Sequence, residues 1–457
     1  MRLSYILPLV AMTLPLVAQE APAPVSQTLM VAPVAVQQAL ESALEQIFSA
    51  QSEDLYPVAL AVLEAGGNEV DFYRLMHQAA EKGNPVAQKW SAYYVLQSAP
   101  MGDITNAAEA VKSRTLLKSS ADAGYVPAMV EMARYAGSGI GAPANEKEGM
   151  QYLMNACKSG SSRARAAYLL LTGRLDAGKF DSPEIASELN KNNYHLEEII
   201  ASMYGAHEAS MEWMQKASDH GSPAAPLLLA QRSETEAESL RLLQLAAERH
   251  QPEALAAYGA ILLSPSASSG LKRDEAAGTR NLQLGMMLGY VSAASTLAGQ
   301  YMNMPETYSA ERVFDLYNIA TVLQDPRASV AYAYCLVMGR GCTPEPEKGV
   351  GMLRALADAG SPYAYVALAD LYFNGNGVAA DMDEAISCLD EANAAGIPHA
   401  YALIAAFTHL GNKTAPPDAR RAELYLQMAE ERNELNARKV FDSIVEKKSW
   451  YFLPPVK

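Results

Sequence analysis

Few residues in this chain have the types and the spacing that chemistry requires, and His207-Glu208 is the first candidate. In zinc proteases such a pair on a helix is followed by a second His four residues after the first, so that both imidazoles bind one metal ion. That position is Met211 here, so the second ligand is missing. The other histidines are scattered, and only His195 and His220 lie loosely near His207 in the sequence. We therefore expect no metal centre and no cofactor.

Two further patterns could indicate catalysis, and both are incomplete. The glycines of Gly137-Ser-Gly139-Ile-Gly141 suggest a phosphate-binding loop, but they lack the Gly-x-Gly-x-x-Gly spacing and follow no predicted strand. The Gly-x-Ser-x-Gly turn of serine hydrolases is absent from the sequence. Cys335 has no local partner that would activate its thiol, which favours a packing role. We expect no catalytic residues, and the chain is predicted not to be an enzyme.

The charge of the chain excludes a further class of function. The sequence holds 36 Lys and Arg against 51 Asp and Glu, which gives a formal net charge of −15 at pH 7. Such a surface repels nucleic acid and anionic membranes. Half of the 457 residues are hydrophobic, so the chain can bury a sizeable core. We expect a folded protein that binds no nucleic acid.

The N-terminus has the pattern of an export signal. Arg2 precedes an apolar run over residues 3–17, and Ala18 ends this run at a position suited to cleavage before Gln19. Residues 1–18 are a predicted signal peptide, and the Pro-rich residues 19–36 are a predicted linker. An uncleaved anchor or a buried first helix stays open as an alternative. No later stretch reaches the roughly 20 apolar residues that span a bilayer, so the mature protein is expected in the periplasm or outside the cell and not within a membrane.

Export would place the four cysteines in an oxidising compartment. Cys335 and Cys342 are seven residues apart, about 10 Å along a continuous helix, whereas a disulfide needs Cα atoms within about 7 Å. They could bond only if the chain turned back at Gly339 and Gly341. A disulfide and two free buried thiols both stay open.

The elements that position these residues follow from a repeat. The pattern Gly-x-x-x-Ala recurs along the chain, and from position 250 three of its copies keep the Ala while another residue replaces the Gly. The intervals between the copies from position 250 onward are 39, 35, 36, 36 and 37 residues. The Gly positions are 83, 124, 160, 221, 289, 360 and 396, and the replaced positions are His250, Gln324 and Asn433. A period near 36 is typical of stacked helical repeats.

Each repeat is predicted to contain two helices. In the copy at Ala364, the residues Ala364, Leu368, Ala369 and Tyr372 form one face of a first helix, because they recur at helical spacing. Two glycines then end this helix, at positions 139/141, 339/341 and 375/377 of the three best copies. Asp381 suits the N-terminus of a second helix, whose buried stripe is Ala385, Leu389 and Ala392. About ten such units would stack into one continuous core.

The stretch from Ala364 to Val378, with Asp381, Ala385 and Gly396, resembles a Sel1-like repeat of the tetratricopeptide-like superfamily. The resemblance covers roughly residues 80–440 and is most specific at 128–164 and 328–400. It implies an all-α right-handed superhelix, a solenoid that scaffolds protein complexes, often in bacterial envelopes. It implies no chemistry.

The chain is predicted to have four folded parts after the linker. Residues 175–245 depart from the period, and Lys179–Tyr194 reads as an insertion. The final residues Trp450–Leu453 either pack over the last hydrophobic face or serve as a docking peptide. The predicted parts are N-terminal repeats at 37–174, irregular repeats at 175–245, C-terminal repeats at 246–437, and a capping helix with a tail at 438–457.

The pattern favours an exported scaffold or adaptor that binds a protein or peptide on the concave face of the solenoid. Two alternatives stay open. One is an envelope enzyme or small-ligand receptor with its site in 175–245, and the other is a cytosolic adaptor with an uncleaved apolar N-terminus.

One row of the first helices is the predicted partner-binding row. The sixth residue after the repeat Ala lies about 240° from that Ala around the helix, away from the apolar stripe. It is Arg134, Tyr334 or Asp370 in the three best copies, and Phe373 lies near the same row. We expect this row to face solvent, so Asp370→Ala should leave stability nearly unchanged whereas Leu368→Asp should destabilise the fold.

Overall fold

Helix propensity and the repeat pattern produce helices over most of the chain. The computed structural model describes residues 33–97, 105–175, 180, 182–205, 207–266, 268–302, 304–397, 399–432, 434, 436–447 and 452–453. The predicted signal peptide and most of the predicted linker lie outside these residues, as do Asn433 and Trp450. Within them are 24 helices and no strand, which confirms the all-α solenoid. Helix α1 (Val34–Ala50) begins inside the last residues of the predicted linker.

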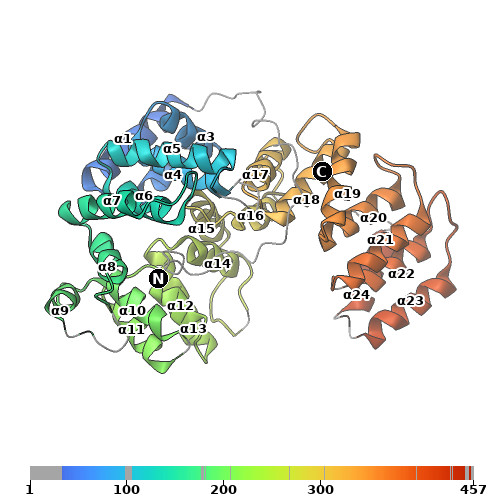
Figure 1. Ribbon diagram of the computed structural model, residues 1–457. Helices are drawn as coiled ribbons and strands as arrows, with labels where there is room; N and C mark the ends of the chain where they lie inside the picture. Colours follow the sequence, from blue (N-terminus) through green and yellow to red (C-terminus); the bar gives the residue numbers. More distant parts are fainter. Residues whose placement is uncertain are drawn as a thin grey trace. The chain divides into compact units, whose positions relative to one another are not determined.

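The described residues divide into two units, the first extending to Leu297 and the second beginning at Ala298. The boundary falls within α16 (Ala293–Met302). The first unit holds α1 to α15 (Figure 1). After α1 its helices are α2 (Tyr56–Glu64), α3 (Glu69–Glu81), α4 (Pro85–Gln97), α5 (Ala108–Asp122), α6 (Val126–Ser138), α7 (Glu146–Lys158), α8 (Ser162–Leu171), α9 (Pro183–Leu189), α10 (Tyr194–Tyr204), α11 (Glu208–Asp219), α12 (Ala225–Ala230), α13 (Glu236–Glu248), α14 (Pro252–Leu263) and α15 (Glu275–Met287).

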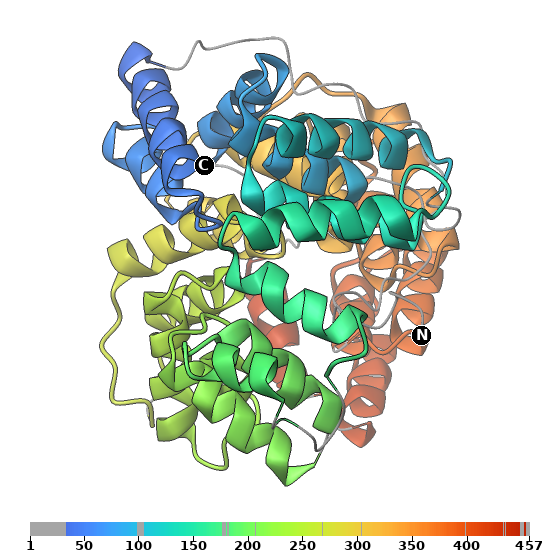
Figure 2. The same cartoon turned by 60° about the vertical axis from the view of Figure 1, so that its left-hand side comes forward.

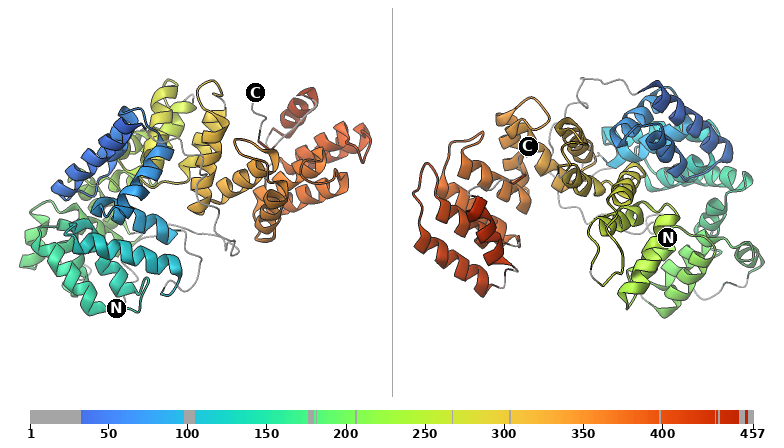
Figure 3. Two further views of the ribbon diagram at one scale, coloured as in Figure 1. Left: turned by 90° about the horizontal axis from the view of Figure 1, so that it is seen from above. Right: turned by 180° about the vertical axis from the view of Figure 1, so that it is seen from behind.

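The second unit is the more regular of the two. Its first and second helices alternate, and successive pairs lie side by side (Figure 3). Its helices are α17 (Ala310–Val322), α18 (Pro326–Met338), α19 (Pro346–Asp358), α20 (Pro362–Asn374), α21 (Met382–Ala394), α22 (Ala400–Leu410), α23 (Ala419–Glu431) and α24 (Ala437–Lys447). The predicted stripes are correct, since Leu368, Ala385 and Leu389 are all buried.

The repeat Gly before each first helix occupies the left-handed region of backbone conformation. Gly360, for example, has φ +86°. His250 and Gln324, which replace this Gly, keep the same conformation with φ of 64° and 61°. An L-residue pays about 1–2 kcal/mol for that conformation. The turn is therefore fixed by the stacking of the helices, even where the residue type opposes it.

The second glycine of each pair is required by a close approach between neighbouring repeats. Gly341 has φ +72°, and a Cβ atom on it would lie 2.1 Å from the carbonyl oxygen of Ala310 at the start of α17. In the equivalent turn, a Cβ on Gly141 would lie 2.3 Å from the carbonyl oxygen of Ala110 in α5. The glycine pairs were predicted as helix ends. They also allow the turn after a first helix to pack closely against the second helix of the preceding repeat.

Small residues bring the two helices of a repeat together. A Cβ atom on Gly349 of α19 would meet the carbonyl oxygen of Ala333 in α18 at 2.6 Å. The same packing is most extensive between α14 and α15. There Gly259 and Gly278 face each other, and a Cβ on either would lie within 2.9 Å of the other's carbonyl oxygen.

The helices of the first unit turn until the end of the unit meets its beginning. Helix α15 packs against α2 and α3 (Figure 2). Gln283 of α15 donates a hydrogen bond of 3.1 Å to the buried carboxylate of Glu69 in α3. Arg280 lies 3.7 Å from Glu64 at the end of α2. This closure joins residues more than 200 positions apart and was not predicted from the sequence.

Residues 175–245, predicted as irregular, contain short helices. Pro183 lies at the start of α9, and Ser182 caps this helix through its hydroxyl group. The polar residues Asn190–Asn193 form the turn into α10, and Asn193 is buried. The four cysteines are free thiols, so Cys335 and Cys342 form no disulfide. Among the described residues, no helix is both long and apolar enough to cross a membrane.

Candidate functional site

The predicted partner-binding row does not face solvent as a whole. Tyr334 and Asp370 are fully buried, and Phe373 is buried in a stacked pair with Phe407, with ring centroids 4.0 Å apart. Only Arg134 stays partly open, with 32% of its side chain exposed. The expectation of a solvent-facing row is therefore wrong at three of its four positions. The reason is that first helices of successive repeats, such as α18 and α20, also pack against one another and cover that side.

Two members of the row meet across the repeat period. Tyr334 of α18 and Asp370 of α20 are 36 residues apart, and the Tyr334 hydroxyl donates a hydrogen bond to Oδ2 of Asp370. Asn374, one turn further along α20, donates from its side-chain amide to Oδ1 of Asp370 at 2.5 Å. The carboxylate of Asp370 thus accepts from two side chains at once.

The end of the chain completes this site. The backbone N–H of Phe452 donates to Oδ2 of Asp370 at 3.1 Å. The guanidinium of Arg340 donates to the carbonyl oxygen of Leu453 at 2.6 Å. The Phe452 ring lies against the Tyr334 ring, with centroids 5.4 Å apart. We call Tyr334, Arg340, Asp370 and Asn374 the tail clamp, because together they hold a dipeptide by its main chain and its aromatic ring.

The electrostatics of the tail clamp are those of a buried acid beside a cation. Burial raises the pKa of Asp370 from its usual 3.8 to about 6, although the donors from Tyr334, Phe452 and Asn374 and the charge of Arg340 oppose the rise. Burial also raises the pKa of the Tyr334 hydroxyl, and the nearby Asp370 carboxylate adds to that rise. At neutral pH the carboxylate is ionised and the phenol keeps its proton, so Tyr334 is a donor and Asp370 an acceptor.

Sequence reasoning missed half of this clamp. Arg340 lies between the two glycines of its repeat, in a turn that was interpreted only as a helix end. Asn374 was not singled out, although it follows Asp370 by one helical turn. The described tail residues Phe452 and Leu453 lie against α18 and α20, and Phe452 also packs against the core of α20 to α24. An Arg in a tight turn of one repeat was the only sequence signal that could have indicated this site.

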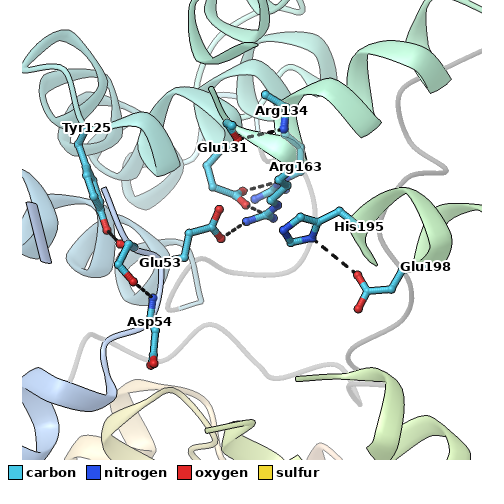
Figure 4. A network of polar contacts seen from close by, with 11 residues as sticks. Glu53, Asp54, Tyr125, Glu131, Arg134, Arg163, His195 and Glu198 are labelled. Carbon is cyan, nitrogen blue, oxygen red and sulfur yellow. Dashed lines mark hydrogen bonds and ion pairs between the residues drawn. The ribbon is translucent and has the colours of Figure 1, made fainter. Parts of the chain in front are cut away.

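Arg134 belongs to a different group of charges, in the first unit. Arg163 of α8 bonds Glu53 at 2.5 Å and Glu131 of α6 at 2.8 Å (Figure 4). Arg134 bonds the other oxygen of Glu131 at 3.0 Å. Burial alone would raise the pKa of Glu131, but the guanidinium groups of Arg163 and Arg134 and the charge of Lys89 outweigh it and hold that pKa at about 2. The Glu131 carboxylate is therefore ionised at neutral pH and poorly suited to exchange protons there.

These charges hold the loop between α1 and α2 against helices from distant repeats. The carbonyl oxygen of Ser52 accepts from the Tyr125 hydroxyl at 2.5 Å. Asp54 bonds His250 at 2.8 Å, and the His250 ring stacks on Tyr56 with centroids 3.6 Å apart. The loop thus contacts Tyr125 just before α6, Arg163 in α8 and His250 just before α14. These contacts place it on the inner side of the curve that the helices of the first unit follow.

The histidines of the irregular region each have a local partner. His207 accepts from the backbone N–H of Ala209 and thereby caps α11. His220 bonds the buried carboxylate of Glu197 at 2.8 Å, and His195 lies 3.8 Å from Glu198. Within the described part of the chain, no three His, Cys, Asp or Glu side chains are grouped so that they could hold a metal ion.

A family model decides what these repeats are. The Sel1 repeat model matches residues 126–161, 207–222, 326–361, 362–397 and 398–434. The three matches between 326 and 434 coincide with the helix pairs α18–α19, α20–α21 and α22–α23. The chain contains Sel1 repeats at these residues. Its tail clamp therefore lies in the part of the molecule where the Sel1 repeats are most regular.

Several solved structures are similar to this chain, and no curated protein matches it. The protective antigen c5321 of uropathogenic Escherichia coli, described as having an SLR fold, is 14% identical over 93% of this chain and 99% of its own, with a TM-score of 0.42. A Sel1 repeat protein from Oxalobacter formigenes is 21% identical over 54% of this chain and 99% of its own, with a TM-score of 0.38. Yeast Tom70 is 13% identical over 90% of this chain and 99% of its own, with a TM-score of 0.28.

Sel1-like and tetratricopeptide-like repeats commonly mediate protein–protein interaction, and they are generally scaffolds without catalytic groups. The two units of this chain differ in their polar networks. In the first unit, the charged network is paired with carboxylates of the loop between α1 and α2. The second unit has a clamp that already holds an extended segment of polypeptide.

Proposed function

We propose that this protein is an exported interaction scaffold and not an enzyme, and that it binds an extended protein or peptide segment along the first helices of its second unit. The observation that carries the proposal is the tail clamp. Asp370 and Arg340 hold the N–H of Phe452 and the C=O of Leu453, which are main-chain groups that every peptide offers. Side-chain pockets beside such contacts then supply specificity.

Export is the part of the proposal that rests on the N-terminal sequence alone. The apolar run after Arg2 and the small residue Ala18 support cleavage before Gln19. N-terminal sequencing of protein recovered from the envelope or the medium is expected to begin at Gln19. Recovery of exported protein with Met1 intact would contradict the predicted cleavage.

Binding is tested by selection of peptides from a displayed random library on the immobilised full chain. The affinity of each enriched peptide is then measured by fluorescence anisotropy for Phe452→Ser, in which the contact of the tail with the clamp is weakened, and for the same variant with Arg340→Ala added. Loss of one main-chain hydrogen bond from a charged donor is expected to weaken binding about tenfold. Arg241→Ala, at an exposed position of α13, is the matched control and should change nothing. If every enriched peptide binds Phe452→Ser equally well with and without Arg340→Ala, the tail clamp is not the binding site.

A further inference from the structure

The tail clamp is occupied by the chain itself. We infer that Phe452-Leu453 is an internal ligand of this site, and that the partner is an extended, uncharged segment with an aromatic residue followed by an aliphatic one, which must displace the tail. The inference rests on the proposed function and names the class of ligand and the step that controls access.

Two charged side chains of the tail clamp match the main-chain groups of one dipeptide. Asp370 accepts the N–H of the first residue, and Arg340 donates to the C=O of the second. These two contacts fix the direction of the segment, since reversing it would place a carbonyl oxygen against the carboxylate. The site supplies one negative and one positive charge, so it favours a segment without net charge of its own at these two residues.

The apolar half sets the preference for side chains. The ring of Phe452 lies on the buried ring of Tyr334, and the Arg340 guanidinium carbon lies 5.2 Å from the centre of the same Tyr334 ring. An aromatic residue thus contacts a tyrosine ring that also lies within cation–π distance of a guanidinium group. Leu453 is buried at the second position, with 9% of it exposed. An aromatic residue and then an aliphatic residue is the order that this surface fits.

The connection to the rest of the chain makes the tail a strong competitor. Only four residues separate Lys447, the last residue of α24, from Phe452. A tether this short keeps the tail at an effective concentration on the order of millimolar beside the clamp. A partner segment of equal intrinsic affinity therefore binds the unchanged protein much more weakly than a protein whose tail cannot occupy the site.

The test uses a fluorescent synthetic peptide with the sequence of residues 448–457, added to the full-length protein near pH 7.5. The variant Phe452→Ser is expected to bind this peptide at least tenfold more tightly than the unchanged protein does, because the internal competitor is weakened. Leu453→Ser is a second variant with the same expected result. Glu446→Ser, at an exposed position just before the tail, is the matched control and should behave like the unchanged protein. Thermal melts followed by circular dichroism establish that each variant is folded.

Specificity is tested with a second peptide in which the residue equivalent to Phe452 is Ser. This peptide should bind the Phe452→Ser variant at least tenfold more weakly than the first peptide, and adding Arg340→Ala to that variant should weaken binding of the first peptide by a similar factor. Equal affinity of the first peptide for the unchanged protein and for both tail variants would overturn the inference, as would a lack of binding to all of them. Neither of these results would change the binding of library peptides that depend on Arg340. The proposed function is therefore tested separately from this inference.

Discussion

Asp370 shows how one buried acid joins three parts of the second unit. It lies on α20, accepts from Tyr334 on α18, and accepts from the backbone of Phe452 near the end of the chain. A carboxylate without exposure to water needs such donors, because an unpaired buried charge is costly. The residue that was predicted to lie in a solvent-facing row is therefore a structural centre of the site.

Replacing this acid should destabilise the protein. Asp370→Ala leaves the Tyr334 hydroxyl and the Phe452 N–H without this acceptor, and we expect a loss of about 3 kcal/mol in the free energy of unfolding. Urea denaturation measures the loss. Asp442→Ala, at an exposed position of α24, is the control and should change stability by less than about 0.5 kcal/mol. Equal midpoints for the two variants would show that Asp370 is solvated in solution.

A second residue-scale prediction concerns pH. Burial, with a smaller contribution from Lys112, lowers the pKa of His77 from 6.5 to about 4. His77 packs between Tyr73 and Trp90, and its ring is within 3.2 Å of the Ser91 hydroxyl. Because the folded-state pKa is depressed, the unfolded chain takes up a proton first as the pH falls. The stabilisation from neutral His77 is present above pH 6.5 and is lost between pH 6.5 and pH 4.

The expected loss is up to about 3 kcal/mol, since each pKa unit corresponds to about 1.4 kcal/mol. Denaturant melts of the unchanged protein and of His77→Gln, at several values of pH from 7.5 to 4, measure it. The difference in stability between the two proteins should shrink or reverse as the pH falls. His207→Gln removes an exposed helix-capping His and serves as the control. Parallel curves for the unchanged protein and His77→Gln would contradict the prediction.

At the scale of elements, the turn before each first helix is a repeated local structure that tolerates different residues. Gly360 and Gln324 occupy the same position of adjacent repeats with φ of 86° and 61°. A Cβ atom on Gly360 would meet no atom within 4 Å, so a side chain has room there and only the left-handed backbone conformation opposes it. The position thus isolates the cost of a left-handed conformation.

An exchange of residue types at this position should change stability in opposite directions. Gly360→Gln is expected to destabilise by about 1–2 kcal/mol, the cost of the left-handed conformation. Gln324→Gly is expected to stabilise by up to about 1 kcal/mol, because the extra freedom of glycine in the unfolded chain offsets part of the gain. Thermal melts of the two variants distinguish this backbone effect from an effect of the side chains alone. A destabilised Gln324→Gly would show that the Gln324 side chain matters more than its backbone.

At the scale of the whole molecule, the first unit departs from a simple repeat array. In a linear solenoid each repeat is stabilised only by its neighbours. Here α15 contacts α2 and α3, and Gln283 bonds the buried Glu69 across 214 residues. The loop between α1 and α2 also bonds Arg163 and His250 inside the same turn. The first repeats are therefore coupled to the last ones of the unit.

This closure predicts a long-range effect of a local change. Gln283→Ala in α15 should increase the amide hydrogen exchange of α3, because it removes a hydrogen bond to the buried Glu69 carboxylate. Exchange detected by mass spectrometry is the measurement, and a several-fold faster exchange in residues 69–81 is the expected result. Gln244→Ala on α13 is the control, since its exposed side chain bonds Glu248 on its own helix. If α3 exchanges at the same rate in both variants, the closing contact does not stabilise the N-terminal helices.

The sequence alone determined the local features of this protein. The period near 36, the helix ends at the glycine pairs and the burial of Leu368 were all predicted, and the left-handed turns at His250 and Gln324 keep the repeat in register. These features could be predicted because helix periodicity and turn chemistry act over a few residues and repeat many times.

The tertiary structure alone decided which side of each helix is covered and by what. The 240° angle located Tyr334 and Asp370 relative to their own apolar stripe, but the neighbouring first helix and the tail cover that side. The pairing of Arg340 with Leu453 spans 113 residues, and that of Gln283 with Glu69 spans 214. Such contacts depend on how successive repeats rotate and on where Phe452 and Leu453 lie, and no local pattern in the sequence encodes either quantity.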